Sequence, residues 1–143
     1  MDKNLSFKDP NDLVDLAGYL KRALRLDSTG AVRLRAFGSV LAVYVSPIYA
    51  GSLLGDGLTV IGLRTINLTS QNERDSLFTI EELVASVDKS AESDELALVL
   101  PKTAARVGWA GISPPRQGWV RAGEVEQEKI SAWAKDGIAA GVD

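Results

Sequence analysis

The sequence has no histidine and no cysteine among its 143 residues. It therefore lacks a side chain whose ordinary pKa lies near 7, a thiolate nucleophile and any disulfide. The same absence removes the ligands of most zinc sites, so we predict no metal centre. A chain without cysteine suits a reducing compartment, and the first nine residues contain no apolar run of the signal-peptide type. We therefore expect a cytoplasmic protein.

Long hydrophobic runs and a basic surplus are also missing. The longest nearly apolar stretch, residues 39–54, is interrupted by Pro47 and Gly51 and is too short to cross a bilayer, so no membrane association is expected. The net charge of −3 argues against nucleic acid as a partner. The length suits a single domain over residues 1–143.

The N-terminal half shows one helical pattern followed by strand patterns. Asp9 and Pro10 are typical of a helix start, and the leucines that follow form one apolar stripe up to about Asp27. Alternation then predicts a strand over 31–37, a tight turn at Gly38-Ser39, and a doubly covered strand over 40–45 that Pro47 ends. A third strand is predicted over 58–68 after a hairpin turn at Asp56-Gly57, and residues 69–76 read as a polar loop.

The C-terminal half continues with a second helix. Thr79 and Glu82 match a capping box, and residues 96–100 form a short apolar strand. A weaker strand is predicted around 106–112. The last helix is predicted over 124–140, where one face carries four apolar residues: Ile130, Trp133, Ala134 and Ile138.

The resulting order, α-β-β-β-α-β-(β)-α, predicts an α+β fold with a mainly antiparallel sheet packed against helices. This order of elements resembles the type III secretion chaperone-like fold. The resemblance implies a protein that binds partner proteins and pairs as a dimer.

None of the motifs that support catalysis is complete. The glycines of residues 51–57 lack the lysine and the following helix of a phosphate-binding loop. Glu81 and Glu82 are adjacent, so on a helix they point about 100° apart and do not flank one bond. The acidic stretch from Glu73 to Glu95 reads as a solvated surface, since it lacks a calcium-loop pattern. We predict no catalytic residue and no cofactor.

One segment has the composition of a binding surface. Residues 96–123 contain no acidic side chain, and they combine four cations with two of the three tryptophans of the chain. Arginine with tryptophan is typical of interaction hot spots. The candidate binding residues are Lys102, Arg106, Trp109, Arg116, Trp119 and Arg121. The alternative interpretation places Trp119 in the core, with Pro114 and Pro115 directing the chain toward the last helix.

The run Ser113-Pro114-Pro115-Arg116-Gln117-Gly118-Trp119, followed by Gly123-Glu124 and the helix around residues 134–138, is similar to uncharacterised actinobacterial proteins with a Pro-Pro-Arg-x-Gly-Trp segment. The resemblance covers about the last third of the chain and brings no activity with it. It implies that these 143 residues are the N-terminal part of a longer protein.

Two hypotheses follow from these observations. The first is a non-catalytic interaction module that binds a protein partner or a second copy of itself as a homodimer. The second is a sensor or enzyme that holds a small anion between Arg116, Trp109 and Trp119. The first needs an exposed patch or an open sheet edge, whereas the second needs a concave pocket.

Overall fold

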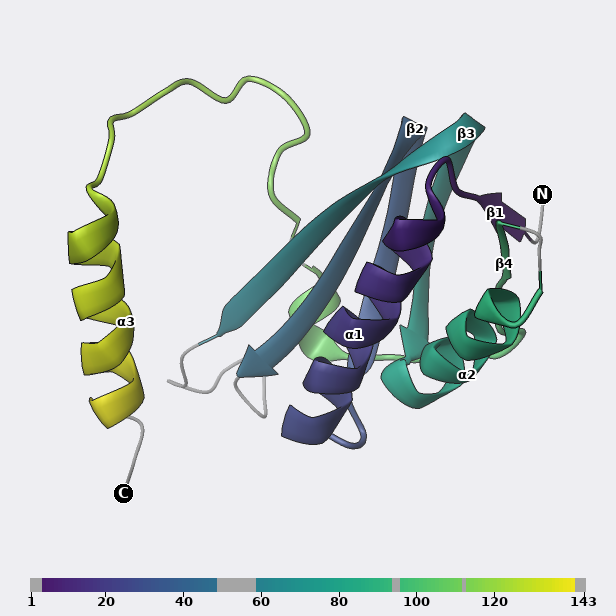
Figure 1. Cartoon of the computed structure of the whole chain (residues 1–143), viewed down its shortest axis with the longest axis horizontal. Helices are drawn as coiled ribbons and strands as arrows, with labels where there is room; N and C mark the ends of the chain where they lie inside the picture. Colours follow the sequence, from purple (N-terminus) through teal and green to yellow (C-terminus); the bar gives the residue numbers. More distant parts are fainter. Residues whose placement is uncertain (1–3, 49–58, 94–95, 112, 141–143) are drawn as a thin grey trace. The chain divides into compact units, whose positions relative to one another are not determined.

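A computed structural model describes residues 4–48, 59–93, 96–111 and 113–140 (Figure 1). The chain forms two compact units, an N-terminal unit (Met1–Ile112) and a C-terminal unit (Ser113–Asp143), and each is described by itself. The prediction of one domain over residues 1–143 stays a prediction. The elements are, in order, β1 (Asn4–Ser6), α1 (Pro10–Leu26), β2 (Ala31–Ile48), β3 (Val60–Thr79), α2 (Ile80–Ala91), β4 (Ala97–Val99), the 3-10 helix η1 (Gly108–Gly111) and α3 (Gln127–Ala140).

The first helix, α1, begins and packs as the sequence predicts. The backbone N–H of Asn11 donates to Asp9 Oδ1 at 2.8 Å, and Pro10 occupies the first turn, where a missing N–H costs nothing. Leu13, Leu16 and Leu20 are buried. The apolar stripe therefore faces the core, and its burial holds the helix in place.

The second helix, α2, uses the predicted cap. The Thr79 hydroxyl accepts a hydrogen bond from the Glu82 N–H at 3.2 Å. Ile80, Leu83 and Val87 are buried behind this cap. Because α2 follows β3 without a loop, Thr79 both ends the strand and begins the helix.

Two predictions about the central strands are wrong. The tight turn at Gly38-Ser39 does not exist, because β2 passes through it as one strand; Gly38 pairs with Asn72 and Val40 with Asn67. Four residues of β3 thus oppose Ser39, and Gly38 accommodates the irregularity with a φ of 60°, which suits glycine. Strand β2 also continues through Pro47 to Ile48, with a second register shift there.

The predicted polar loop over 69–76 is likewise part of strand β3. Within this stretch, residues 72–76 pair with residues 34–38 of β2, and most of its polar side chains are exposed. Partner pairing, rather than an apolar alternation, makes it a strand. The predicted hairpin turn at Asp56-Gly57 lies outside the described residues.

The short strands β1 and β4 pair antiparallel, with Leu5 opposite Leu98. The prediction of a strand at 96–100 is confirmed over Ala97–Val99. Strand β1 was not predicted, because three residues are too few to show a period. Phe7, just after β1, forms an isolated bridge with Leu68 of β3.

The main core lies between helices α1 and α2 and one face of the β2–β3 ribbon. Leu34 and Leu41 of β2 are fully buried on this face, together with Leu68 and Phe78 of β3. A second, smaller apolar cluster contains Ala31 and Tyr44, whose positions alternate with those of the main core. The α+β class with antiparallel pairing is confirmed, and the three helices and the strands between them follow the predicted order, with the first two predicted strands joined in β2.

The segment after β4 differs from its prediction. In place of a strand around 106–112, residues 108–111 form η1. The Ala105 N–H donates to the Leu77 carbonyl at 2.8 Å, and the described residues of this segment form no strand with the ribbon. Of the helices in the described residues, none is both long enough and apolar enough to cross a membrane.

Candidate interaction surface

The six predicted binding residues divide between the two units. Lys102, Arg106 and Trp109 belong to the N-terminal unit. The other three, Arg116, Trp119 and Arg121, belong to the C-terminal unit. The two groups of residues are therefore described separately, each within its own unit.

Trp109 lies in the second apolar cluster. It is 8% exposed and shares this cluster with Ala31, Tyr44 and Ala110. Lys102 and Arg106, by contrast, are exposed. The indole of Trp109 thus supplies core area beneath the surface and offers no face to a partner.

An arginine fork attaches η1 to the ribbon. Arg33 Nε and Nη2 donate to the two carboxylate oxygens of Asp75 at 2.8 and 2.6 Å, and Nη1 donates to the Ala110 carbonyl at 2.7 Å. The hydrogen bonds to Asp75 raise the pKa of Arg33, against the opposing effect of burial. Arg33 therefore stays charged and acts as a structural clamp that keeps Trp109 against the sheet.

Trp119 has the opposite environment. Its side chain is 71% exposed, and its indole Nε1 donates to the Pro115 carbonyl at 2.7 Å. Gly118, at a φ of 84°, provides the left-handed residue within this turn. The interpretation that Trp119 folds into the core is wrong. Because its only donor is already used, the ring offers an apolar face and edge to a partner.

Two arginines lie close to Trp119 in the sequence. Arg121 forms an ion pair with Glu124, three residues along the chain. Arg116 is exposed, between Pro115 and the turn at Gly118. Arg121 therefore has much of its charge offset locally, and Arg116 is the arginine placed within the Trp119 turn.

Sequence reasoning missed one part of this surface. The sequence predicts that Ile130, Trp133 and Ile138 share one face of the last helix, and in α3 all three are exposed and no residue is buried. An amphipathic pattern says that a helix has an apolar face, but not what covers it. We call five exposed apolar residues of the C-terminal unit the C-terminal apolar surface: Trp119, Val120, Ile130, Trp133 and Ile138.

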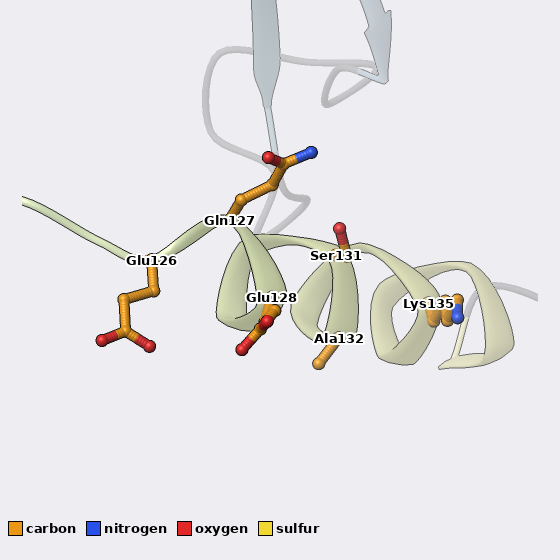
Figure 2. Close-up of a pocket in the computed structure, with 6 residues that line it drawn as sticks. All are labelled: Glu126, Gln127, Glu128, Ser131, Ala132 and Lys135. Atoms are coloured by element: carbon orange, nitrogen blue, oxygen red, sulfur yellow. The ribbon is translucent and has the colours of Figure 1, made fainter.

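A shallow concavity on α3 is not a ligand site. Figure 2 shows that its lining side chains project from one helix and the residue before it, rather than from facing walls. Several lie on the polar side of α3, away from the apolar face, and they mix both charges. The lining residues are Glu126, Gln127, Glu128, Ser131, Ala132 and Lys135. A single helix leaves a bound molecule open to water, whereas ligand pockets enclose most of it.

The described part of the chain contains no group of three acidic side chains positioned for a metal ion. A half-buried tyrosine in the N-terminal unit is the other notable titratable group. Burial raises the pKa of the Tyr19 hydroxyl, and nearby Arg64, whose guanidinium carbon lies 5.4 Å from the ring centre, partly offsets that rise.

Comparison with known proteins gives one result. No curated protein and no solved structure matches the chain. A family model described as "Domain of unknown function (DUF8010)" matches residues 1–111, which end at the boundary of the N-terminal unit. The chain therefore belongs to the DUF8010 family.

Proposed function

We propose that this chain is a non-catalytic, cytoplasmic protein-interaction module whose C-terminal unit binds a protein partner. The observation that carries the proposal is the C-terminal apolar surface. Its five large side chains are all exposed, and no described residue from Pro115 to Ala140 is buried. Exposed apolar groups gathered in one short segment are typical of a binding surface.

The energetics favour a protein partner. Burying one large apolar side chain contributes roughly 1.5–3 kcal/mol, so two tryptophans and two isoleucines can support a stable contact. Tryptophan and arginine are the residue types most enriched at interaction hot spots. An apolar helix face with flanking aromatics matches the way amphipathic helices bind in a groove of a partner.

The position of Arg116 narrows the chemistry of the partner. It precedes Trp119 by three residues in the turn that the indole N–H closes. A partner with an apolar groove beside a carboxylate is complementary to both side chains, because arginine pairs bidentately with carboxylates. We therefore favour an acidic partner segment.

The anion-sensor hypothesis has no supporting observation. It needs Trp109 and Trp119 at the border of one pocket, whereas Trp109 is buried in the N-terminal unit. No second function is proposed.

The test is capture with the whole chain as immobilised bait. Extract from the source cells is passed over wild-type and variant baits, and bound proteins are quantified by mass spectrometry. The variants are Trp119→Ala, Arg116→Ala and Trp133→Ala. With the captured partner purified, we expect each tryptophan variant to raise Kd by about 30-fold or more, the effect of losing a hot-spot residue of about 2 kcal/mol.

Matched controls come from exposed residues outside the surface. Lys135→Ala lies on the polar side of α3, and Arg106→Ala lies in the N-terminal unit; both should bind as wild type. The proposal fails if the tryptophan variants retain every wild-type partner. It also fails if they lose thermal stability without losing a partner, because that result assigns the two rings to packing.

A further inference from the structure

One half of the β2–β3 ribbon lacks a third strand. The bridge between Phe7 and Leu68 brings the β1 segment alongside the middle of β3. Near the end of β3, the Ala105 N–H donates a hydrogen bond to the Leu77 carbonyl. In Figure 1, β1 lies beside the second half of β3, away from its start, and β4 pairs with β1. Among the described residues, the only strand paired with Val60–Asn67 is β2.

The start of β3 therefore has a free edge. In an antiparallel strand, every second residue points both its N–H and its C=O toward the same edge, so an unpaired edge is a template for another strand. A two-stranded ribbon is marginally stable alone, and a third strand stabilises it. In the other half of the ribbon, contacts from the β1 segment and from Ala105 fill this role.

Natural edge strands are usually protected by charges or proline. Residues 60–67, Val-Ile-Gly-Leu-Arg-Thr-Ile-Asn, contain one charge and no proline. Arg64 stacks over the Tyr19 ring on the helix side, and Ile66 on the same side is buried. On the opposite side, Leu63 is 51% exposed and Ile61 is also exposed. This edge is therefore apolar and weakly guarded.

We propose that β3 of one copy pairs antiparallel with β3 of a second copy over Val60–Ile66, with Leu63 opposite the Leu63 of the other copy. Two ribbons then form one continuous four-stranded sheet, and each supplies the strand that the other lacks. The contact is isologous, as in most homodimers.

Charge excludes the register centred on Arg64, and the exposed Leu63 side chain favours the register proposed. With Leu63 on the two-fold axis, Arg64 faces Gly62 of the other copy, so the two guanidinium groups are not opposite each other. A register centred on Arg64 would place like charges directly opposite, which is destabilising. The chosen register also brings the two exposed Leu63 side chains together on the sheet face opposite α1. On this same face it places Ile61 opposite Thr65, so the side chains paired there are uncharged. On the face toward α1, Arg64 is opposite Gly62 and Val60 is opposite Ile66.

A second copy is also the simplest source of a matching strand. The segment is self-complementary, because its single cation meets a glycine rather than another cation. The proposal does not depend on the C-terminal apolar surface, which lies in the other unit.

Cysteine crosslinking tests the register, and the natural chain provides a cysteine-free background. In the proposed dimer, Leu63→Cys places two thiols on directly opposite residues. Antiparallel partners have Cα atoms about 4.5–5.5 Å apart, which is within disulfide range. Under mild oxidation we expect the full-length Leu63→Cys variant to form a covalent dimer. Arg64→Cys should not, because its two copies are offset by two residues along the strands.

Solution mass tests the pairing itself. We expect the full chain to have the mass of two copies in analytical ultracentrifugation, and Leu63→Lys to have the mass of one at the same concentration. Val14→Lys, at another exposed apolar position on α1, is the matched control and should remain a dimer. Circular dichroism of each variant reports that the fold is retained.

Three results would overturn the proposal: a wild-type chain with the mass of one copy, a Leu63→Lys chain that remains a dimer, or crosslinking through Arg64→Cys in preference to Leu63→Cys. The partner capture that tests the C-terminal apolar surface is scored with different variants. A monomeric wild type with normal capture would therefore refute the dimer alone.

Discussion

Two tryptophans only ten positions apart have opposite surroundings in this protein. Trp109 is buried in the N-terminal unit against Tyr44, and the Arg33 fork holds the neighbouring Ala110. Trp119 is exposed in the C-terminal unit, where its indole N–H bonds only a nearby carbonyl. A composition rich in tryptophan and arginine is therefore compatible both with a structural clamp and with a binding surface. The surrounding sheet decides which one forms.

The largest expected effect contrasts these two rings. Trp109→Ala should lower the free energy of unfolding by about 3–5 kcal/mol, because it leaves a cavity in the second cluster. Trp119→Ala should change it by less than about 0.5 kcal/mol, as for an exposed residue. Denaturant unfolding followed by far-ultraviolet circular dichroism measures both. Equal losses for the two variants would contradict the distinction between buried and exposed tryptophan.

The next effect compares arginines. Arg33→Met removes three charge-assisted hydrogen bonds from a guanidinium whose side chain is 13% exposed. The expected loss is about 1.5–3 kcal/mol of unfolding free energy. Arg33→Lys should recover only part of it, since lysine lacks the planar fork. In the C-terminal unit, Arg121→Met is the control, and its exposed pair with Glu124 should leave stability unchanged.

A smaller effect depends on pH. Tyr19 is half-buried, and its hydroxyl has no hydrogen-bond partner among the described residues. Its pKa is raised above 10.0 in the folded protein, so the unfolded state releases this proton first as pH rises. The free energy of unfolding should therefore decrease above about pH 10, where the unfolded tyrosine ionises.

Tyr19→Phe should make this alkaline decrease shallower and cost less than about 1 kcal/mol at neutral pH, because it removes an unsatisfied hydroxyl. Urea titrations at pH 7, 9 and 11 measure both effects. All three tyrosines lie before residue 50, so no tyrosine of the C-terminal unit contributes to the change of unfolding free energy with pH. An unchanged slope in the Tyr19→Phe variant would show that another group controls the alkaline loss.

The smallest expected effect is that of removing residues 113–143. Every buried apolar residue in the described part of the chain lies at or before Ala110. A chain that ends at Ile112 should therefore unfold cooperatively with a free energy within about 0.5 kcal/mol of that of the whole protein. A large loss of unfolding free energy, measured by calorimetry, would show that the C-terminal unit stabilises the N-terminal unit. The contrast between a core-forming unit and an exposed unit would then be wrong.

The helices could be predicted from the sequence because their signals are local. The side chains of Asp9 and Thr79 cap their helices. Each accepts a hydrogen bond from a backbone N–H, two residues further along the chain for Asp9 and three for Thr79. The leucines of α1 repeat at the helical period and are buried as expected. Each of these features depends on neighbours within one or two turns.

The errors came from long-range pairing. Residues 69–76 look like a loop because they are polar, yet β2 pairs with them as a strand. Gly38 looks like a turn, but its left-handed conformation is accommodated as an irregularity within β2. The candidate site was divided for the same reason: the fold buries Trp109 and leaves Trp119 exposed. No local pattern contains that information.

Composition and local spacing are enough to predict the α+β class, the two capped helices and the absence of imidazole and thiol chemistry. Long-range contacts are needed to show which tryptophan is buried, which arginine is a clamp and which half of β3 has no third strand among the described residues. These features depend on what lies across the sheet, from residues that are distant in the chain. Burial is a property of that neighbourhood, and the amino-acid order records it only indirectly.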